Sequence, residues 1–91
     1  MFDDTLDFHN LGLLEPNQIK YHFDSFIENS FSQGSNYLLI VTGKGDPQNN
    51  SRGLVKKVVS QLLKTNKHIL KYKQADDSWG GSGAFEIWLK D

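Results

Sequence analysis

Apolar and polar residues alternate with a period of two near the start of the chain, in the stretch Thr5–His9. In a β-strand with this pattern, Leu6 and Phe8 face a hydrophobic core, while Asp7 and His9 share the opposite face. The pattern therefore predicts a short first strand.

A helix is predicted next, because apolar residues then recur at intervals of three and four. Proline is favoured in the first turn of a helix and glycine often follows the last turn, so we place this helix between Pro16 and Gly34. Its apolar positions are Ile19, Phe23, Phe26, Ile27 and either Ser30 or Phe31.

A second strand and a second helix flank a polar loop. Residues 37–41 are continuously apolar and rich in strand-forming types, which is typical of a strand covered on both faces. After the loop, Ser51 is a candidate cap for a helix. The apolar stripe of that helix is Leu54, Val55, Val58, Val59, Leu62 and Leu63, and Lys56, Lys57 and Lys64 fall outside it.

Two more strands are predicted, one around Ile69, Leu70 and Tyr72 and one at residues 84–89, with the turn-forming residues 76–83 between them. The order of elements is βαβαββ. We therefore predict an α/β fold, a two-layer α/β sandwich with both helices on one sheet, and a single domain over residues 1–91.

Composition excludes several classes of protein. Hydrophobic residues make up 37% of the chain and aromatic residues 12%, which is enough to form a core without disulfides. Cysteine is absent from the sequence, which excludes a disulfide scaffold and a thiolate metal site. We find no secretory signal and no apolar stretch near the roughly 20 residues of a membrane span, so we expect a cytoplasmic protein.

Charge is unevenly distributed along the chain, although the net value is only −1. Residues 1–43 hold six acids against Lys20 alone, whereas residues 44–73 hold eight cations against Asp46 alone. The cations are Lys44, Arg52, Lys56, Lys57, Lys64, Lys67, Lys71 and Lys73. Such a segment is either a solvated helix face rich in lysine or a cationic surface for a phosphate backbone.

The polar loop carries residues suited to a phosphate. In open α/β sheets, ligands bind at the carboxyl ends of the strands, and the amino terminus of a helix adds partial positive charge. The loop begins Thr42-Gly43-Lys44-Gly45, and Lys44, Arg52 and Lys56 would supply full charges. It lacks the Gly-Lys-Ser/Thr of a P-loop, which excludes an NTPase of that class. A plain surface loop would also explain the Gly-x-Gly.

Asp7 and His9 form a second candidate group. If the first two strands are parallel neighbours, their carboxyl ends open at the same edge as the polar loop. A carboxylate beside an imidazole orients the ring and raises its basicity, which suits proton transfer at neutral pH. The alternative is a strand end that faces water, with His9 hydrogen-bonded to a neighbour.

Three ordered motifs resemble the signatures of the Smr (small MutS-related) domain family. They are LDFHNLG at residues 6–12, TGKG at residues 42–45 and GGSGAFEIWL at residues 80–89. The resemblance spans nearly the whole chain and implies a fold similar to the C-terminal domain of bacterial initiation factor three. It also implies nucleic-acid binding and, in several branches of the family, nicking of DNA or cleavage of RNA, including mRNA on stalled ribosomes.

The resemblance assigns roles residue by residue. Asp7 and His9 stand at the catalytic positions of the first motif. With Lys56 added from the charge argument above, the nucleic-acid- or phosphate-binding residues are Thr42, Gly43, Lys44, Gly45, Arg52, Lys56, Gly80, Gly81 and Gly83. Two departures bear on this assignment. Asn10 replaces the usual glycine after the histidine, although asparagine tolerates a left-handed backbone, and Thr42 replaces the histidine of the commoner loop, which removes one candidate acid or base.

Other polar and aromatic residues have ordinary structural explanations. His22 lies beside the apolar stripe of its helix and His68 near the start of a strand, so we predict that both are structural. Asp76 and Asp77 have no third oxygen ligand at a suitable spacing, and we infer neither a metal nor a cofactor. Trp79 is either a core or rim residue or a ring that stacks on a base.

The sequence thus favours a nucleic-acid-binding domain with endonuclease activity on RNA or DNA. The alternative is a non-catalytic adaptor that docks on nucleic acid or on the ribosome through the surface between Lys44 and Lys73. The retained Asp7 and His9 favour the nuclease, whereas Thr42 and the near-neutral net charge favour the adaptor. We expect a monomeric domain without a membrane partner.

Overall fold

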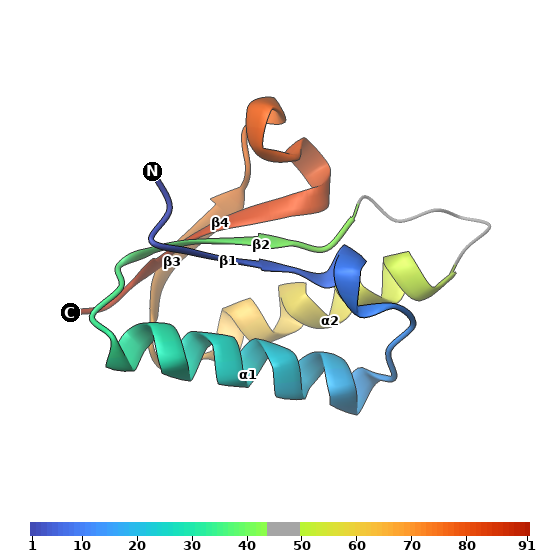
Figure 1. Ribbon diagram of the computed structural model, residues 1–91, viewed down its shortest axis with the longest axis horizontal. Coiled ribbons are helices and arrows are strands. Elements are labelled where there is room, and N and C mark those ends of the chain that lie inside the picture. Colours follow the sequence, from blue (N-terminus) through green and yellow to red (C-terminus); the bar gives the residue numbers. More distant parts are fainter. Residues whose placement is uncertain (44–49) are drawn as a thin grey trace.

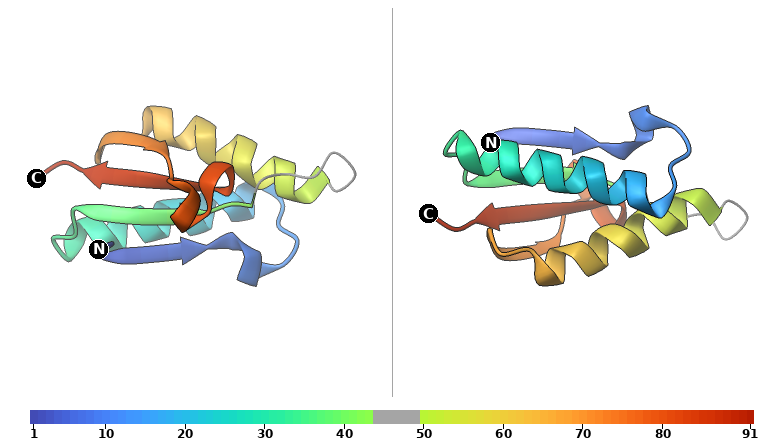
Figure 2. Two further views of the ribbon diagram at one scale, coloured as in Figure 1. Left: turned by 90° about the horizontal axis from the view of Figure 1, so that it is seen from above. Right: turned by 90° about the horizontal axis from the view of Figure 1, so that it is seen from below.

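The computed structural model describes residues 1–43 and 50–91, and of residues 50–52 only the backbone. Within these residues the strands and α-helices are β1 (Asp4–Asp7), α1 (Pro16–Ser32), β2 (Tyr37–Val41), α2 (Asn50–Thr65), β3 (Ile69–Gln74) and β4 (Ala84–Leu89). Short 3-10 helices are η1 (Phe8–Leu11), η2 (Asp77–Trp79) and η3 (Gly81–Gly83). Both α-helices cover one face of the sheet (Figures 1 and 2), so the predicted two-layer βαβαββ sandwich is confirmed.

The strand order in the sheet is β1-β2-β4-β3. β1 and β2 are parallel neighbours, with Asp7 opposite Val41. β4 is antiparallel to both β2 and β3, and its register with β3 shifts between Ile69 and Lys71. β2 and β4 therefore form the interior of the sheet, while β1 and β3 are its edges.

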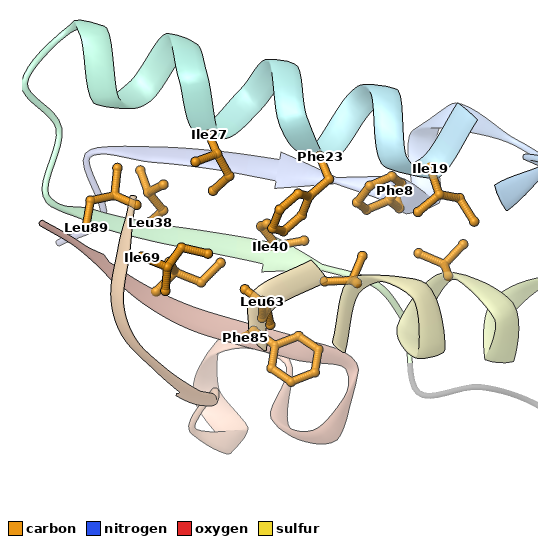
Figure 3. Packing of buried hydrophobic residues seen from close by; sticks show 13 residues of the cluster. Phe8, Ile19, Phe23, Ile27, Leu38, Ile40, Leu63, Ile69, Phe85 and Leu89 are labelled. Carbon is orange, nitrogen blue, oxygen red and sulfur yellow. The ribbon is translucent and has the colours of Figure 1, made fainter. Parts of the chain in front are cut away.

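The main hydrophobic core lies between the sheet and the two α-helices (Figure 3). From α1 it receives Ile19, Phe23 and Ile27, which recur at intervals of four and so share one face of the helix. Its other buried members are Phe8, Leu38, Ile40, Val55, Val59, Leu63, Ile69, Phe85, Ile87 and Leu89. Because burying one such side chain typically contributes about 1.5–3 kcal/mol, the positions that predicted the elements also hold the layers together.

The ends of α1 match their sequence signals. Pro16 is the first residue of the helix, and the Gln18 side chain accepts a hydrogen bond from the Glu15 backbone N–H at 2.7 Å. Gly34 follows the helix with φ of 80°, a left-handed conformation that glycine adopts without strain. α2 begins at Asn50, so Ser51 lies inside the helix. Its predicted capping role is wrong, because a cap keeps an extended backbone outside the first turn.

The first strand ends two residues earlier than predicted, at Asp7. There the Oδ1 atom of Asp7 accepts a hydrogen bond from the backbone N–H of His9 at 2.8 Å. This bond folds the chain into η1, because an aspartate side chain competes with the strand ladder for backbone N–H groups. Phe8 still enters the core. Gly12 ends η1 with φ of 74°, and Asn10 does not adopt a positive φ.

The opposite face of the sheet carries a smaller apolar cluster. Leu39, Ala75 and Ala84 are buried there, and Phe2 and Val41 pack against them. η2 and η3 rise from this face, on the side away from the helices (Figure 1). β2 is therefore apolar on both faces, as its sequence predicted. Within the described residues, neither helix is long and apolar enough to cross a membrane.

Candidate functional site

The predicted groups gather at one end of the molecule. Because β1 and β2 are parallel neighbours, their carboxyl ends lie side by side, with η1 following the first and Thr42-Gly43 following the second. The amino end of α2 lies at that end too (Figures 1 and 2). This edge of an α/β sheet is the usual location of a ligand site.

Asp7 and His9 are brought together, as predicted, but by a turn rather than by a shared strand face. The Asp7 Oδ1 atom that caps the His9 N–H also lies 3.4 Å from Nδ1 of the His9 ring. The His9 side chain is 42% exposed and that of Asp7 38%, so the pair is accessible from solvent. With Nδ1 turned toward the carboxylate, Nε2 is the ring nitrogen that can take a proton from a ligand.

The other two histidines contact core side chains. His22 on α1 meets the ring of Phe8 edge-on, with the centroids 6.5 Å apart. His68 stacks on Phe31 with the centroids 3.9 Å apart, and its Nε2 lies 3.0 Å from the Glu28 carboxylate. These contacts agree with the predicted structural roles. His68 and Glu28 also form a second imidazole–carboxylate pair in this chain, which provides a control for the first.

Thr42 is only 2% exposed, and both its hydroxyl and its backbone N–H are already hydrogen-bonded. Its hydroxyl donates to the backbone carbonyl oxygen of Gly43 at 2.9 Å or of Gly83 at 3.3 Å. The backbone N–H groups of Thr42 and Gly43 both donate to the Gly83 oxygen, at 2.8 and 3.0 Å. These donors hold the start of the loop against the glycine turn and do not face a phosphate in this structure.

The glycines of the last motif shape that turn. Gly80 and Gly81 have φ values of 116° and 54°, a region that favours glycine. A Cβ atom at Gly81 would lie 3.0 Å from the Asp77 Oδ1 atom, and one at Gly80 would lie 3.1 Å from the Ala84 Cβ. Gly83 is buried, and its carbonyl oxygen accepts the hydrogen bonds from the backbone N–H groups of Thr42 and Gly43. In this structure the motif positions a backbone acceptor, while its predicted contact with nucleic acid stays a prediction.

The predicted cations are described to different extents. Lys44 and Gly45 lie outside the described residues, and so does the side chain of Arg52, whose backbone is in the first turn of α2. Lys56 is half-buried one turn further along. Their role in neutralising a phosphate therefore stays a prediction. Among residues 1–43 and 50–91, no group of three histidine, cysteine or acidic side chains is arranged to hold a metal ion.

A buried carboxylate beside the glycine turn was not predicted. Glu86 on β4 is 3% exposed, and it accepts hydrogen bonds from the Tyr37 hydroxyl and, at 3.3 Å, from the Asp76 backbone N–H. The hydrogen bond to Glu86 and burial together raise the pKa of Tyr37 to about 12. The available signal was a single acid inside the apolar strand AFEIWL, because a carboxylate at such a position needs partners.

Known proteins share both the sequence pattern and the fold. The model of the Smr domain family matches residues 6–90. Endonuclease MutS2 of Lactobacillus johnsonii is 32% identical over 69 residues, which are 76% of this chain and 8% of that protein. This chain therefore spans a small part of that relative.

Two crystal structures have the same fold. YdaL, a stand-alone small MutS-related protein from Escherichia coli, matches 96% of this chain and 64% of its own with a TM-score of 0.83 and 24% identity. The Smr domain of Thermus thermophilus MutS2 matches 97% of this chain and 98% of its own with a TM-score of 0.76 and 20% identity. At these identities the likeness bears on the fold alone.

Proposed function

Because this chain belongs to the Smr domain family, we propose that it is a nucleic-acid-binding domain that cleaves phosphodiester bonds, with Asp7 and His9 as its catalytic residues. The relative that it resembles in sequence is an endonuclease, MutS2, of which this chain covers 8%. The proposal assigns nuclease activity to the part that the two chains share.

The observation that carries this proposal is the arrangement of His9. Its ring is exposed at the carboxyl edge of the parallel strands, and its Nδ1 faces the Asp7 carboxylate. A base needs this combination, because the carboxylate selects the tautomer with a free Nε2 and stabilises the imidazolium that forms after proton transfer. The 3.4 Å separation between Nδ1 and Oδ1 is long for a hydrogen bond, and such contacts often tighten when substrate binds.

RNA supplies its own nucleophile for such a site. His9 removes the proton of a 2′-hydroxyl, the 2′-oxygen attacks the adjacent phosphorus, and the 5′-oxygen of the next nucleotide leaves and takes a proton from water. The developing charge on the phosphorus oxygens is stabilised by the amino terminus of α2 and by Lys44 and Arg52, which the sequence assigns to this role. The products are a 2′,3′-cyclic phosphate and a 5′-hydroxyl.

The test compares three variants on labelled single-stranded RNA and on supercoiled DNA, with and without a chelator. His9→Gln should slow cleavage by about a hundredfold to ten-thousandfold, which is the usual contribution of a general base. Asp7→Asn keeps an oxygen that can cap η1 and removes the negative charge, so it should slow cleavage without unfolding the turn. His68→Gln is the matched control and should cut RNA at the wild-type rate.

Binding and product ends complete this test. Both variants keep every lysine and arginine of the chain, so RNA affinity should stay within about twofold of wild type. Cleavage by His9→Gln at the wild-type rate would refute the catalytic assignment. Loss of cleavage with chelator would point to a metal-dependent reaction, and 3′-hydroxyl ends would point to attack by water.

The burial of Thr42 favours a second candidate function, a nucleic-acid- or ribosome-binding adaptor without catalysis. Thr42 stands where the commoner loop has a histidine, and its hydroxyl is bound to backbone carbonyl oxygens. The site therefore lacks the second proton-transfer group that a histidine there would supply. If the unmodified domain binds RNA with an affinity that falls as salt rises, but cuts neither RNA nor DNA, this function is supported over the nuclease.

A further inference from the structure

Five side chains form a continuous row across the sheet face opposite the α-helices. The Nζ atom of Lys71 on β3 lies 4.8 Å from the ring centroid of Trp88 on β4. Trp88 stacks on Tyr37 of β2 with the centroids 5.0 Å apart, and Tyr37 meets Phe2 at 4.6 Å. Phe2 in turn meets the edge of Trp79 in η2 at 5.3 Å. We call these five residues the aromatic row.

Most of the aromatic row lies outside the hydrophobic core. In the part of the chain that the structure describes, Tyr37, Trp79 and Trp88 belong to neither of the two buried apolar clusters. Trp79 is 39% exposed, and Phe2, Tyr37 and Trp88 are half-buried. Both α-helices lie on the other face of the sheet (Figures 1 and 2). The row is therefore reachable from solvent.

Backbone and side-chain hydrogen bonds keep the row in place. The Tyr37 hydroxyl donates to the buried Glu86 carboxylate. The Asp3 carboxylate accepts from the backbone N–H groups of Asn36 and Tyr37 at 2.9 and 3.0 Å, while the Asp3 N–H donates to the Tyr37 carbonyl oxygen at 2.7 Å. These bonds place Phe2 beside Tyr37. Rings that are ordered before binding lose little freedom when a ligand stacks on them.

At one end of the row, the charge is complementary to phosphate. The row ends at Lys71, and Lys73 lies two positions further along β3 on the same face of the sheet. The acids at the row are Glu86, which is 3% exposed and close to Lys73, Asp3, whose carboxylate binds the backbone N–H groups of Asn36 and Tyr37, and Asp76 and Asp77, which precede Trp79. Aromatic rings beside cations match the two parts of an unpaired nucleic-acid strand, its bases and its phosphates. An acidic protein segment would use the cations but would have no need of the rings.

We propose that the aromatic row stacks the unpaired bases of a single-stranded nucleic acid. This inference rests on the proposed function and adds to it a preference for single strands over duplexes. Leu6 and Phe8 turn toward the core, so Asp7 between them lies on the same side of the sheet as the row. Tyr37 begins β2 and Val41, opposite Asp7, ends it, so Tyr37 lies roughly 13 Å along the strand from the level of Asp7. A strand held on the row can therefore reach His9 within a few nucleotides.

The test uses a labelled single-stranded DNA ten-mer, which has no 2′-hydroxyl to be cleaved, and the same sequence in a duplex. Both tryptophans of the chain lie in the row, so stacking should quench the intrinsic fluorescence of the wild-type protein with the single strand. Trp79→Ala should weaken single-strand binding by roughly fivefold to a hundredfold. Its duplex affinity should stay within about twofold, and its salt dependence should not change, because no charge is removed.

Two further variants separate stacking from folding. Trp79→Phe keeps an aromatic face and should retain most of the single-strand affinity. Tyr21→Ala is the matched control, because Tyr21 is a 68% exposed aromatic residue on α1, away from the row, and should bind as wild type does. If Trp79→Phe is as weak as Trp79→Ala, aromatic stacking is not the cause and the proposal fails.

The outcomes also distinguish this proposal from the proposed function. If wild type binds the single strand but Trp79→Ala binds it equally well and no quenching occurs, the row is not the platform, and nucleic-acid binding stands. If wild type binds neither the single strand nor the duplex, both proposals fail. Quenching by polyglutamate but not by the ten-mer would identify an acidic protein segment as the ligand and would overturn the stacking role.

Discussion

Glu86 shows how one buried residue organises several neighbours. Its carboxylate accepts hydrogen bonds from the Tyr37 hydroxyl and the Asp76 backbone N–H, and Lys73 lies 3.9 Å away. A buried carboxylate is tolerated only when its oxygens have such partners. The bond to Asp76 also fixes the point at which the chain leaves β3 for the glycine turn. Glu86 therefore connects Tyr37 of the aromatic row to the start of the glycine turn, and that turn binds the loop that follows β2.

We predict that Tyr37 makes stability depend on pH in the alkaline range. Folding raises the pKa of Tyr37 from 10.0 to about 12, chiefly through the hydrogen bond to Glu86. The folded state thus holds this proton more tightly than the unfolded chain does. The resulting stabilisation is complete below about pH 10 and is lost as the pH rises through about 12. Denaturant titrations at about pH 9 and about pH 11 measure the change in the free energy of unfolding.

Tyr37→Phe is the matched control for this prediction, because it keeps the ring and removes the ionisable hydroxyl. The other titrating groups are common to both proteins, so their effects cancel in the comparison. The free energy of unfolding should fall more steeply with pH in wild type than in Tyr37→Phe. Equal slopes in the two proteins would show that the Glu86 bond does not shift the Tyr37 titration.

Sequence separation decides which contacts of the site could be predicted. Asp7 and His9 are two positions apart, so their proximity followed from local geometry, although a turn rather than a strand produces it. Thr42 and Gly83 are 41 positions apart, and Tyr37 and Glu86 are 49 apart. Such contacts depend on the strand order, which puts β4 between β2 and β3. The periodicity of apolar residues along the chain does not indicate the strand order. The burial of Thr42 against Gly83 was therefore not predicted.

At the scale of elements, the helices and strands that could be predicted from the sequence are those with a repeated apolar pattern. α1 and α2 each show several turns of helical spacing, β2 is apolar along its whole length, and β4 is apolar except for Glu86. η1, η2 and η3 have only three or four residues each, which is too short for any period to appear. They form through an aspartate cap and through glycine conformations instead. The position of η1 is therefore the main difference from the predicted fold.

We predict that the glycine turn will not accept a side chain. Gly81 has φ of 54°, and a Cβ there would lie 3.0 Å from Asp77 Oδ1, so Gly81→Ala should lower the free energy of unfolding by about 1–2 kcal/mol. Gly53→Ala is the control. Gly53 lies within α2 with open space around it, and alanine there should raise the free energy of unfolding by about 0.5–1 kcal/mol. Urea titrations measure both, and a Gly81→Ala protein as stable as wild type would contradict the prediction.

At the scale of the whole molecule, the fold separates the two signs of charge. α1 and β1 lie along one flank and α2 and β3 along the other (Figure 2). Residues 1–43, which form the first flank and β2, hold six acids and one lysine. The second flank carries Lys56, Lys57, Lys64, Lys67, Lys71 and Lys73. The net charge of −1 therefore conceals a basic flank that can attract phosphates.

The last prediction concerns the salt dependence that this basic flank should produce. Lys71 and Lys73 are exposed and two positions apart on β3, which places them on the sheet face that carries the aromatic row. If both contact phosphates, the plot of log affinity against log salt concentration for a single strand should lose about 0.7 in slope for each lysine changed to glutamine. Lys20→Gln, on α1 and paired with Asp24, is the control and should leave the slope unchanged. A wild-type affinity that does not vary with salt would exclude phosphate contacts, and a larger change with Lys20→Gln would place the nucleic acid on the acidic flank instead.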